Sequence, residues 1–202
     1  MQKLHVIYIP GLGDRKVTGQ QRAIGIWRFW GVKPELFQMN WGDKEPWEPK
    51  FKRLLARIDA LSSQGKSVGL VGVSAGASAV IHAYAARKDS LVGAVCIAGK
   101  INRPEAIGQR YRTNNPAFVT SANTCQQALL TLTPADRSRI LSRFAVFDGV
   151  VAMQDSRVPH AHNRLSPTIG HVLTIALQIT LGAPSFLHFL KHQARKLRES
   201  NL

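Results

Sequence analysis

The sequence predicts an α/β fold: a three-layer α/β/α sandwich in which helices cover both faces of a mostly parallel sheet of about five or six strands. Short apolar runs alternate with stretches of helical periodicity through the first half of the chain, which is typical of such a sheet. Glycine-rich and polar segments directly follow the apolar runs, as loops do at the carboxyl ends of parallel strands. With 202 residues, of which 45% are hydrophobic, we expect residues 1–202 to form a single domain.

Four apolar runs in the first half of the chain are expected to be strands. They are residues 4–9, 35–41, 68–72 and 91–98. The segments between them carry apolar residues at helical spacing, and we expect helices at residues 17–30, 50–63 and 75–87. Gly31 ends the first of these helices, as a glycine after a helix often does.

The second half of the chain has a weaker pattern. Residues 100–133 begin as a polar, basic loop and are expected to flank the mouth of a functional site. The other expected elements are helices at 117–132 and 134–144, a strand at 150–153, an apolar helix at 172–181 and a basic helix after residue 184. Because Gly182 and Pro184 interrupt the apolar stretch at 172–190, we expect a core helix there and not a membrane span.

Basic residues dominate the charge of the chain. Lys and Arg total 27 against 12 Asp and Glu, which gives a net charge of +15. This charge favours anionic partners, and the C-terminal helix, with Lys191, Arg195 and Arg198 at helical spacing beside apolar residues, is the expected contact with an anionic membrane surface. Nucleic acid is disfavoured as a partner because no zinc-ligand spacing or RNA-binding signature accompanies the charge.

Cysteine usage and the start of the chain bear on the compartment. Cys96 and Cys125 are too few for a disulfide framework. A strand is expected almost at once after Met1, and the sequence shows no apolar leader with a cleavage site. We therefore expect a cytoplasmic protein.

The segment Gly72-Val73-Ser74-Ala75-Gly76 lies between an expected strand and an expected helix. This G-x-S-x-G pattern, in that context, is a nucleophile elbow, a tight turn that exposes a serine above the sheet. Glycine is needed on both sides of the serine because side chains there would crowd the turn. The sequence therefore predicts that Ser74 is a nucleophile, and that the backbone N–H of Ala75 faces a developing oxyanion.

A nucleophilic serine needs a histidine base and a carboxylate that orients the base. Asp155 follows the expected strand at 150–153 and is the expected carboxylate, with Asp148 as the alternative. His171 stands at a loop–helix junction after Asp155 and is the expected base. His160 and His162 remain alternatives for that role.

The second oxyanion donor is expected in the glycine-rich turn after the first strand, Pro10-Gly11-Leu12-Gly13-Asp14. The N–H of Leu12 is the first choice, because the glycines on either side let the backbone come close to a substrate. A phosphate-binding loop is excluded at this turn because the Gly-Lys-Ser/Thr ending is absent.

Together these motifs resemble the α/β-hydrolase family over nearly the whole chain. The residues that carry the resemblance are the turn at 8–14, the elbow at 72–76, the segment Gln154-Asp155-Ser156-Arg157-Val158-Pro159 and Gly170-His171. The resemblance implies hydrolysis of an ester, thioester or amide through an acyl-enzyme, without metal or cofactor. Two departures follow from the same comparison: the chain begins on the family's third strand, and the family's final strand is expected to be absent or very short, which suggests a lidless, exposed site.

The sequence thus predicts a minimal serine hydrolase that cleaves a small-molecule carboxylic ester. Ser74 is the expected nucleophile, His171 the base and Asp155 the orienting carboxylate. A lysophospholipase or thioesterase activity is the alternative among enzymes. The alternative from another class is a catalytically silent scaffold that binds a partner or an anionic surface.

Overall fold

The computed structural model describes residues 3–199, which fold into one six-stranded sheet with neighbouring strands parallel throughout. The strand order is β2-β1-β3-β4-β5-β6. The strands are β1 (Leu4–Ile9), β2 (Val32–Leu36), β3 (Val68–Val73), β4 (Leu91–Ile97), β5 (Ile140–Phe147) and β6 (His162–Ile169). The predicted α/β class and strand number are therefore confirmed.

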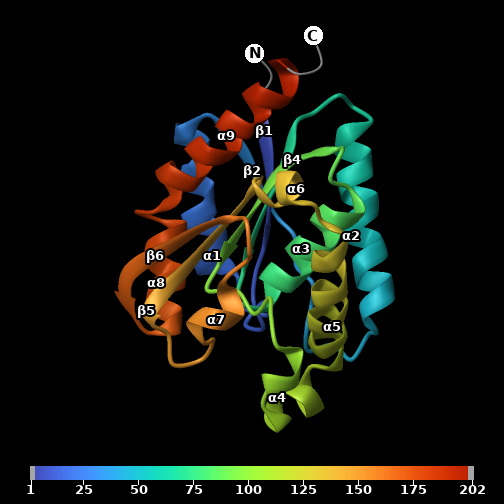
Figure 1. Cartoon of the computed structure of the whole chain (residues 1–202), viewed down its shortest axis with the longest axis vertical. Coiled ribbons are helices and arrows are strands. Elements are labelled where there is room, and N and C mark those ends of the chain that lie inside the picture. Colours follow the sequence, from blue (N-terminus) through green and yellow to red (C-terminus); the bar gives the residue numbers. More distant parts are fainter. Residues whose placement is uncertain (1–2, 200–202) are drawn as a thin grey trace.

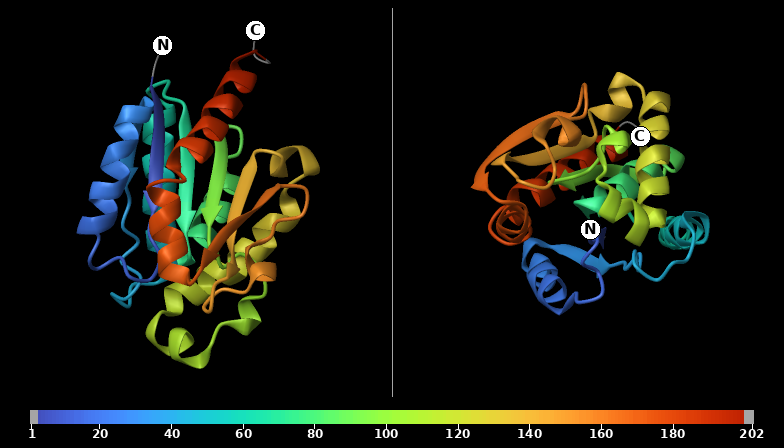
Figure 2. Two further views of the ribbon diagram at one scale, coloured as in Figure 1. Left: turned by 90° about the vertical axis from the view of Figure 1, so that its left-hand side faces the viewer. Right: turned by 90° about the horizontal axis from the view of Figure 1, so that it is seen from below.

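Helices cover both faces of this sheet, which makes the three layers visible in Figures 1 and 2. One face carries α1 (Thr18–Gly25), the 3-10 helix η1 (Ile26–Trp30), α8 (His171–Ile179) and α9 (Ala183–Glu199). The other face carries α2 (Trp47–Ser62), α3 (Ala75–Ala86) and α5 (Pro116–Thr131). The shorter helices are η2 (Pro104–Ala106), α4 (Gln109–Asn114), α6 (Pro134–Arg137) and α7 (Met153–Ser156).

The core consists of two apolar clusters, one on each face of the sheet. Along β1, Val6 and Tyr8 belong to the cluster under α9, whereas Ile7 and Ile9 belong to the cluster under α2 and α3. This alternation follows from the two-residue period of a strand. Because both faces of a central parallel strand are covered, its sequence is a continuous apolar run, and such runs were readily predicted.

The second strand, β2, spans Val32–Leu36, so it begins and ends earlier than the predicted range of 35–41. The chain after it is held away from the sheet by two buried charged side chains. The carboxylate of Asp14 accepts the backbone N–H of Asn40 at 2.5 Å, and the ammonium of Lys50 donates to the Asn40 carbonyl at 2.9 Å. These bonds satisfy the backbone groups that a longer strand would have paired.

The prediction was wrong between residues 134 and 169. The expected helix at 134–144 is replaced by the four-residue α6 and the long strand β5, and the expected strand at 150–153 lies in a loop and the start of α7. The final strand is present, since β6 has eight residues. It was missed because it forms the edge of the sheet, is largely exposed and contains Pro167, so it has no apolar alternation.

The C-terminal helix is confirmed, but its apolar residues are not free for a membrane. Phe186 and Leu190 are fully buried in the cluster that covers the sheet. The exposed side chains of α9 are all polar or charged, and most of them are basic. No single helix within residues 3–199 has the length and apolar character to cross a bilayer. Helices α8 and α9 meet those criteria only as a pair, with a 61° bend between them.

Candidate active site

Ser74 occupies a strained turn between β3 and α3. Its backbone angles are φ 52° and ψ −121°, a region that a residue with a side chain rarely adopts. The glycines on either side of it are required by contact. A Cβ added to Gly72 would lie 2.5 Å from the carbonyl oxygen of Gly76, and one added to Gly76 would lie 2.2 Å from the carbonyl oxygen of Ile9. The predicted elbow geometry is therefore confirmed.

The glycine-rich turn after β1 lies against Ser74. A Cβ added to Gly11 would stand 2.9 Å from the Cβ of Ser74, and Leu12 lines the cavity that contains the serine hydroxyl. Ala75 is the first residue of α3, so its N–H belongs to the unpaired first turn of that helix. The backbone of both predicted oxyanion donors is thus beside Ser74, and their role as donors stays a prediction.

A buried carboxylate fixes the turn after β1. Asp14 accepts the N–H groups of Asn40 at 2.5 Å and Trp41 at 3.3 Å, and the indole N–H of Trp41 donates to the Pro10 carbonyl at 3.1 Å. Burial raises the pKa of Asp14, and the two N–H bonds oppose this rise. The turn that carries Leu12 is therefore held rigidly at both ends, as preorganised donors require.

His171 is the first residue of α8 and lies over Ser74, as predicted. Its Nε2 is 2.9 Å from the Ser74 Oγ, and its Nδ1 is 2.8 Å from Oδ1 and 2.9 Å from Oδ2 of Asp148. Asp148 directly follows β5, and its Oδ1 also accepts the N–H groups of Val150 and Val151. Three side chains from separate segments of the chain thus form one hydrogen-bonded series.

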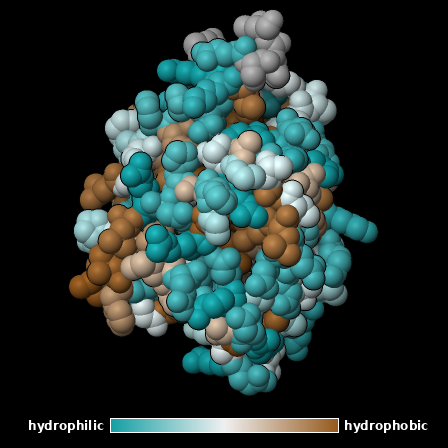
Figure 3. All heavy atoms as spheres, viewed as in Figure 1, coloured by the Kyte–Doolittle hydropathy of each residue, from teal (hydrophilic) through white to brown (hydrophobic). Residues whose placement is uncertain are grey.

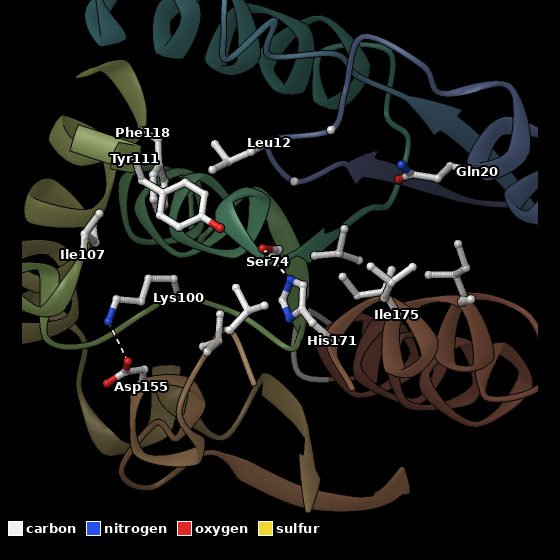
Figure 4. A pocket seen from close by; sticks show the side chains of 18 of the residues that line it. Leu12, Gln20, Ser74, Lys100, Ile107, Tyr111, Phe118, Asp155, His171 and Ile175 are labelled. Atoms are coloured by element: carbon white, nitrogen blue, oxygen red, sulfur yellow. Dashed lines mark hydrogen bonds and ion pairs between the residues drawn. The ribbon is translucent and has the colours of Figure 1, made fainter. Parts of the chain in front are cut away.

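The carboxylate on His171 is Asp148, so the predicted position of Asp155 is corrected. The prediction placed the strand at 150–153, but β5 ends at Phe147, and the loop that follows its carboxyl end therefore begins with Asp148. Asp155 lies farther on, in α7, and is 3% exposed. Its oxygens accept from Lys100 Nζ, as Figure 4 shows, and from Arg103 Nε, each at 2.5 Å.

The two alternative histidines lie elsewhere. His160 stands in a turn with φ 64°, and His162 is the first residue of β6, where its ring packs edge-on against Phe189 at 5.3 Å. Neither lines the cavity around Ser74. One feature of the sequence does point to Asp148: it is followed by a glycine and stands at the end of the apolar run 140–147. That run was not recognised as a strand.

A cavity of about 870 Å³ opens over Ser74 and His171, with Ser74 between two arms (Figure 4). One arm is apolar and runs between α1 and α8, where Ala23, Ile175 and Ile179 line it. The other extends toward η2 and α4, past Ile107 and Tyr111. The expected position of residues 100–133 at the mouth of the site is thereby confirmed.

The apolar arm continues onto the molecular surface. Figure 3 shows an apolar patch over the region of β6 and α8. Exposed apolar side chains there include Phe147, Ile169 and Val172, each at least 65% exposed, and Val172 also lines the cavity. The cavity therefore opens beside a surface that favours apolar groups.

The second arm is the charged part of the cavity. Lys100 and Arg103 reach it from the segment after β4, and Lys16 lines the cavity from the segment between β1 and α1. In the sequence, Lys100 and Arg103 are recognisable only as part of a basic loop. Within residues 3–199, no cluster of three or more His, Cys, Asp or Glu side chains is placed to hold a metal ion. Cys96 and Cys125 are both buried and unbonded to each other.

Comparisons with known proteins agree on the fold. No model of a known protein family matches the chain, and no curated protein sequence matches it. Among solved structures, the chain resembles one described under the metagenome-derived lipolytic enzymes LipS and LipT (TM-score 0.69, 11% identity, 98% of this chain and 94% of the other covered). A second is from work on carboxylesterases of the ammonia-oxidising thaumarchaeon Nitrososphaera gargenis (TM-score 0.70, 10% identity, 96% of this chain and 92% of the other covered).

A third similar structure is the mouse alpha/beta hydrolase domain-containing protein 10 (TM-score 0.66, 15% identity, 94% of this chain and 90% of the other covered). These likenesses extend over nearly the full length of both partners in each comparison. The chain therefore has the α/β-hydrolase fold, which confirms the fold that its motifs indicate. At such low identity the likeness concerns the fold alone, and the chemistry is argued from the site.

Proposed function

We propose that this protein is a serine hydrolase that cleaves carboxylic esters through an acyl-enzyme on Ser74. The observation that carries the proposal is the hydrogen-bonded chain from Ser74 Oγ through the His171 ring to the Asp148 carboxylate. A serine hydroxyl is a weak nucleophile until a base takes its proton, and a buried carboxylate keeps that base in the required tautomer.

In the first half of the reaction, His171 Nε2 accepts the hydroxyl proton as Ser74 Oγ attacks the ester carbonyl. The tetrahedral intermediate places its negative charge near the N–H groups of Leu12 and Ala75, which stabilise it. His171, now an imidazolium held by Asp148, donates its proton to the departing alkoxide. The C–O bond of the ester breaks, the alcohol leaves, and the acyl group remains on Ser74.

In the second half, water takes the place of the alcohol. His171 removes a proton from this water, the hydroxide attacks the acyl-enzyme, and the same N–H groups stabilise the second tetrahedral intermediate. His171 then returns the proton to Ser74 Oγ, which leaves a carboxylic acid and the free enzyme. Apart from the ester and the water that it consumes, the cycle as proposed uses only side chains and backbone N–H groups of this chain.

An ester is the favoured substrate class for two reasons. The similar structures include proteins described as lipolytic enzymes and carboxylesterases. The apolar arm between α1 and α8 is suited to an acyl chain, because it is lined by Ala23, Ile175 and Ile179. A lysophospholipase or thioesterase uses the same acyl-enzyme, and its substrate would occupy the same arm.

The proposal is tested by hydrolysis of p-nitrophenyl esters of graded chain length. We expect turnover by the wild-type protein and a loss of about 10⁴-fold or more in kcat in the Ser74→Ala variant, the usual cost of removing a triad member. A wild-type protein that hydrolyses no ester in the series, or a Ser74→Ala variant with unchanged turnover, would overturn it. Absence of hydrolysis by the wild-type protein would favour the scaffold alternative.

A further inference from the structure

The cavity carries an excess of positive charge, and two of its cations, Lys100 and Arg103, lie in the arm that extends toward η2 and α4. Lys16, Lys100 and Arg103 line the cavity, and Asp155 is the only carboxylate among the described residues that do so. Three cations against one carboxylate leave two positive charges in excess when His171 is neutral. A concave site lined by one sign of charge concentrates ligands of the opposite sign.

Asp155 holds two of these cations in place. It is buried, and it bonds Lys100 Nζ and Arg103 Nε at 2.5 Å each. Figure 4 shows the Lys100 side chain reaching from beside Ser74 to Asp155. A buried ammonium without a partner would be strongly unfavourable, so Asp155 makes the burial of Lys100 possible while the site holds no substrate.

The cations retain capacity for a further anion. An ammonium has three N–H donors. The Lys100 side chain is only 8% exposed, so these donors are shielded from water, and electrostatic attraction is stronger in such a shielded place than in water. Lys16 is exposed and has no ion-pair partner within residues 3–199. An anion that enters the cavity would therefore meet one shielded and one unpaired cation.

We propose that this charged arm binds a carboxylate of the substrate, so that the protein prefers esters that carry a carboxylate to neutral esters of the same size. This inference rests on the proposed ester hydrolysis at Ser74. It assigns the two arms different tasks: the arm between α1 and α8 takes the apolar chain, and the arm lined by Lys100 and Arg103 takes the charged end.

The test uses two matched pairs of esters, because the carboxylate can belong to either half of the substrate. In the first pair the acyl half differs: mono-p-nitrophenyl glutarate against p-nitrophenyl hexanoate. In the second the alcohol half differs: the butyrate ester of m-hydroxybenzoate against that of m-isopropylphenol. We expect the anionic member of at least one pair to have a kcat/KM about tenfold higher, the lower end of what a hydrogen bond to a charged group contributes.

Variants of the lining residues assign this preference to the charged arm. Lys16→Met and Lys100→Met should each lower the ratio of anionic to neutral kcat/KM about tenfold. Asp155→Asn should raise the ratio, because it releases both cations from their carboxylate. Lys52→Met removes an exposed lysine from α2, outside the cavity, and should leave the ratio unchanged. Lys16 is itself exposed, so its variant tests the inference even if Lys100→Met fails to fold.

Salt gives an independent reading of the same ratio. The preference for the anionic ester should shrink between about 0.05 M and about 1 M salt, since the Debye length falls to about 3 Å at the higher value. Equal kcat/KM values within both pairs would overturn the inference, as would a ratio that neither lysine variant changes. Failure of the proposed function itself would be distinct, because then neither member of any pair would be hydrolysed.

Discussion

Asp148 holds the ring of His171 through both carboxylate oxygens, with Nδ1 2.8 Å from Oδ1 and 2.9 Å from Oδ2. A carboxylate on Nδ1 keeps the proton on that nitrogen, which leaves Nε2 free to accept the proton of Ser74. The other candidate carboxylate, Asp155, is occupied by two cations. Replacing each aspartate by asparagine should therefore lower kcat to very different extents.

The first prediction compares these two aspartates on a neutral ester. Asp148→Asn should lower kcat by about 10⁴-fold, because the amide favours the wrong tautomer of His171. Asp155→Asn should lower kcat by less than about tenfold, far short of the loss that follows from a wrong tautomer. Steady-state kinetics on p-nitrophenyl butyrate measure both, and the reverse order would return the orienting role to Asp155.

The sequence predicted the fold and the site correctly where strands are buried on both faces of the sheet. The strands that end next to the elbow and the turn after β1 are central, so their apolar runs were recognised, and with them Ser74, Leu12 and Ala75. His171 was found because the start of α8 follows a glycine, at position 170.

The sequence was misleading at the last two strands of the sheet, β5 and the edge strand β6. Strand β5 carries Arg143, whose guanidinium donates to Gln178 and packs over Phe186, so a charged residue in the strand is satisfied by tertiary contacts. That residue hid the strand, and the error in the strand moved the predicted carboxylate from Asp148 to Asp155. The pairing of Asp155 with Lys100 depends on loops that meet only in the folded chain, so no local pattern indicated it.

The second prediction concerns the length of the acyl chain. Gly19 lines the cavity on α1, and an added Cβ there meets no atom within 4 Å, so Gly19→Leu should fold and narrow the apolar arm. The ratio of kcat/KM for octanoate to that for acetate should fall about tenfold, as expected when a pocket loses room for one or two methylene groups. Gly25→Leu, in the same helix but outside the cavity, is the matched control. An unchanged ratio in Gly19→Leu would place the acyl chain elsewhere.

The third prediction concerns the stability of the elbow. Gly76 packs α3 directly against the end of β1. Gly76→Ala would place a methyl group 2.2 Å from the Ile9 carbonyl oxygen, which is too close for any side chain. We expect a loss of about 1–3 kcal/mol in the free energy of unfolding, the usual cost of overpacking. Urea denaturation measures it. Gly19→Ala is the control and should be neutral or slightly stabilising, since alanine is the better helix former; equal midpoints for the two variants would refute the packing argument.

The fourth prediction concerns pH and His82. Burial lowers the pKa of His82 to about 4, and its ring stacks on Phe51 with centroids 3.9 Å apart. In the unfolded chain a histidine titrates near pH 6.5. As the pH falls from about 6.5 to about 4, the unfolded state therefore binds this proton first, and the free energy of unfolding decreases.

The His82→Gln variant should make this decrease smaller. Denaturant midpoints at pH about 7 and about 4.5 give the pH-dependent difference for each protein, and that difference does not depend on how much the substitution destabilises the fold at both values. His188→Gln removes an exposed histidine from α9 and is the control. If the two variants retain the same pH-dependent difference as the wild type, His82 does not contribute to it.

The most direct test of the account is covalent labelling of Ser74 by a fluorophosphonate, which reacts with an activated serine and not with an ordinary hydroxyl. Intact-protein mass spectrometry should find a single adduct on the wild-type protein, and peptide mapping should place it on Ser74. The Ser74→Ala variant should take up no label, and His171→Ala should react far more slowly. A wild-type protein that stays unlabelled, or a label that persists in Ser74→Ala, would contradict the central claim that Ser74 is an activated nucleophile.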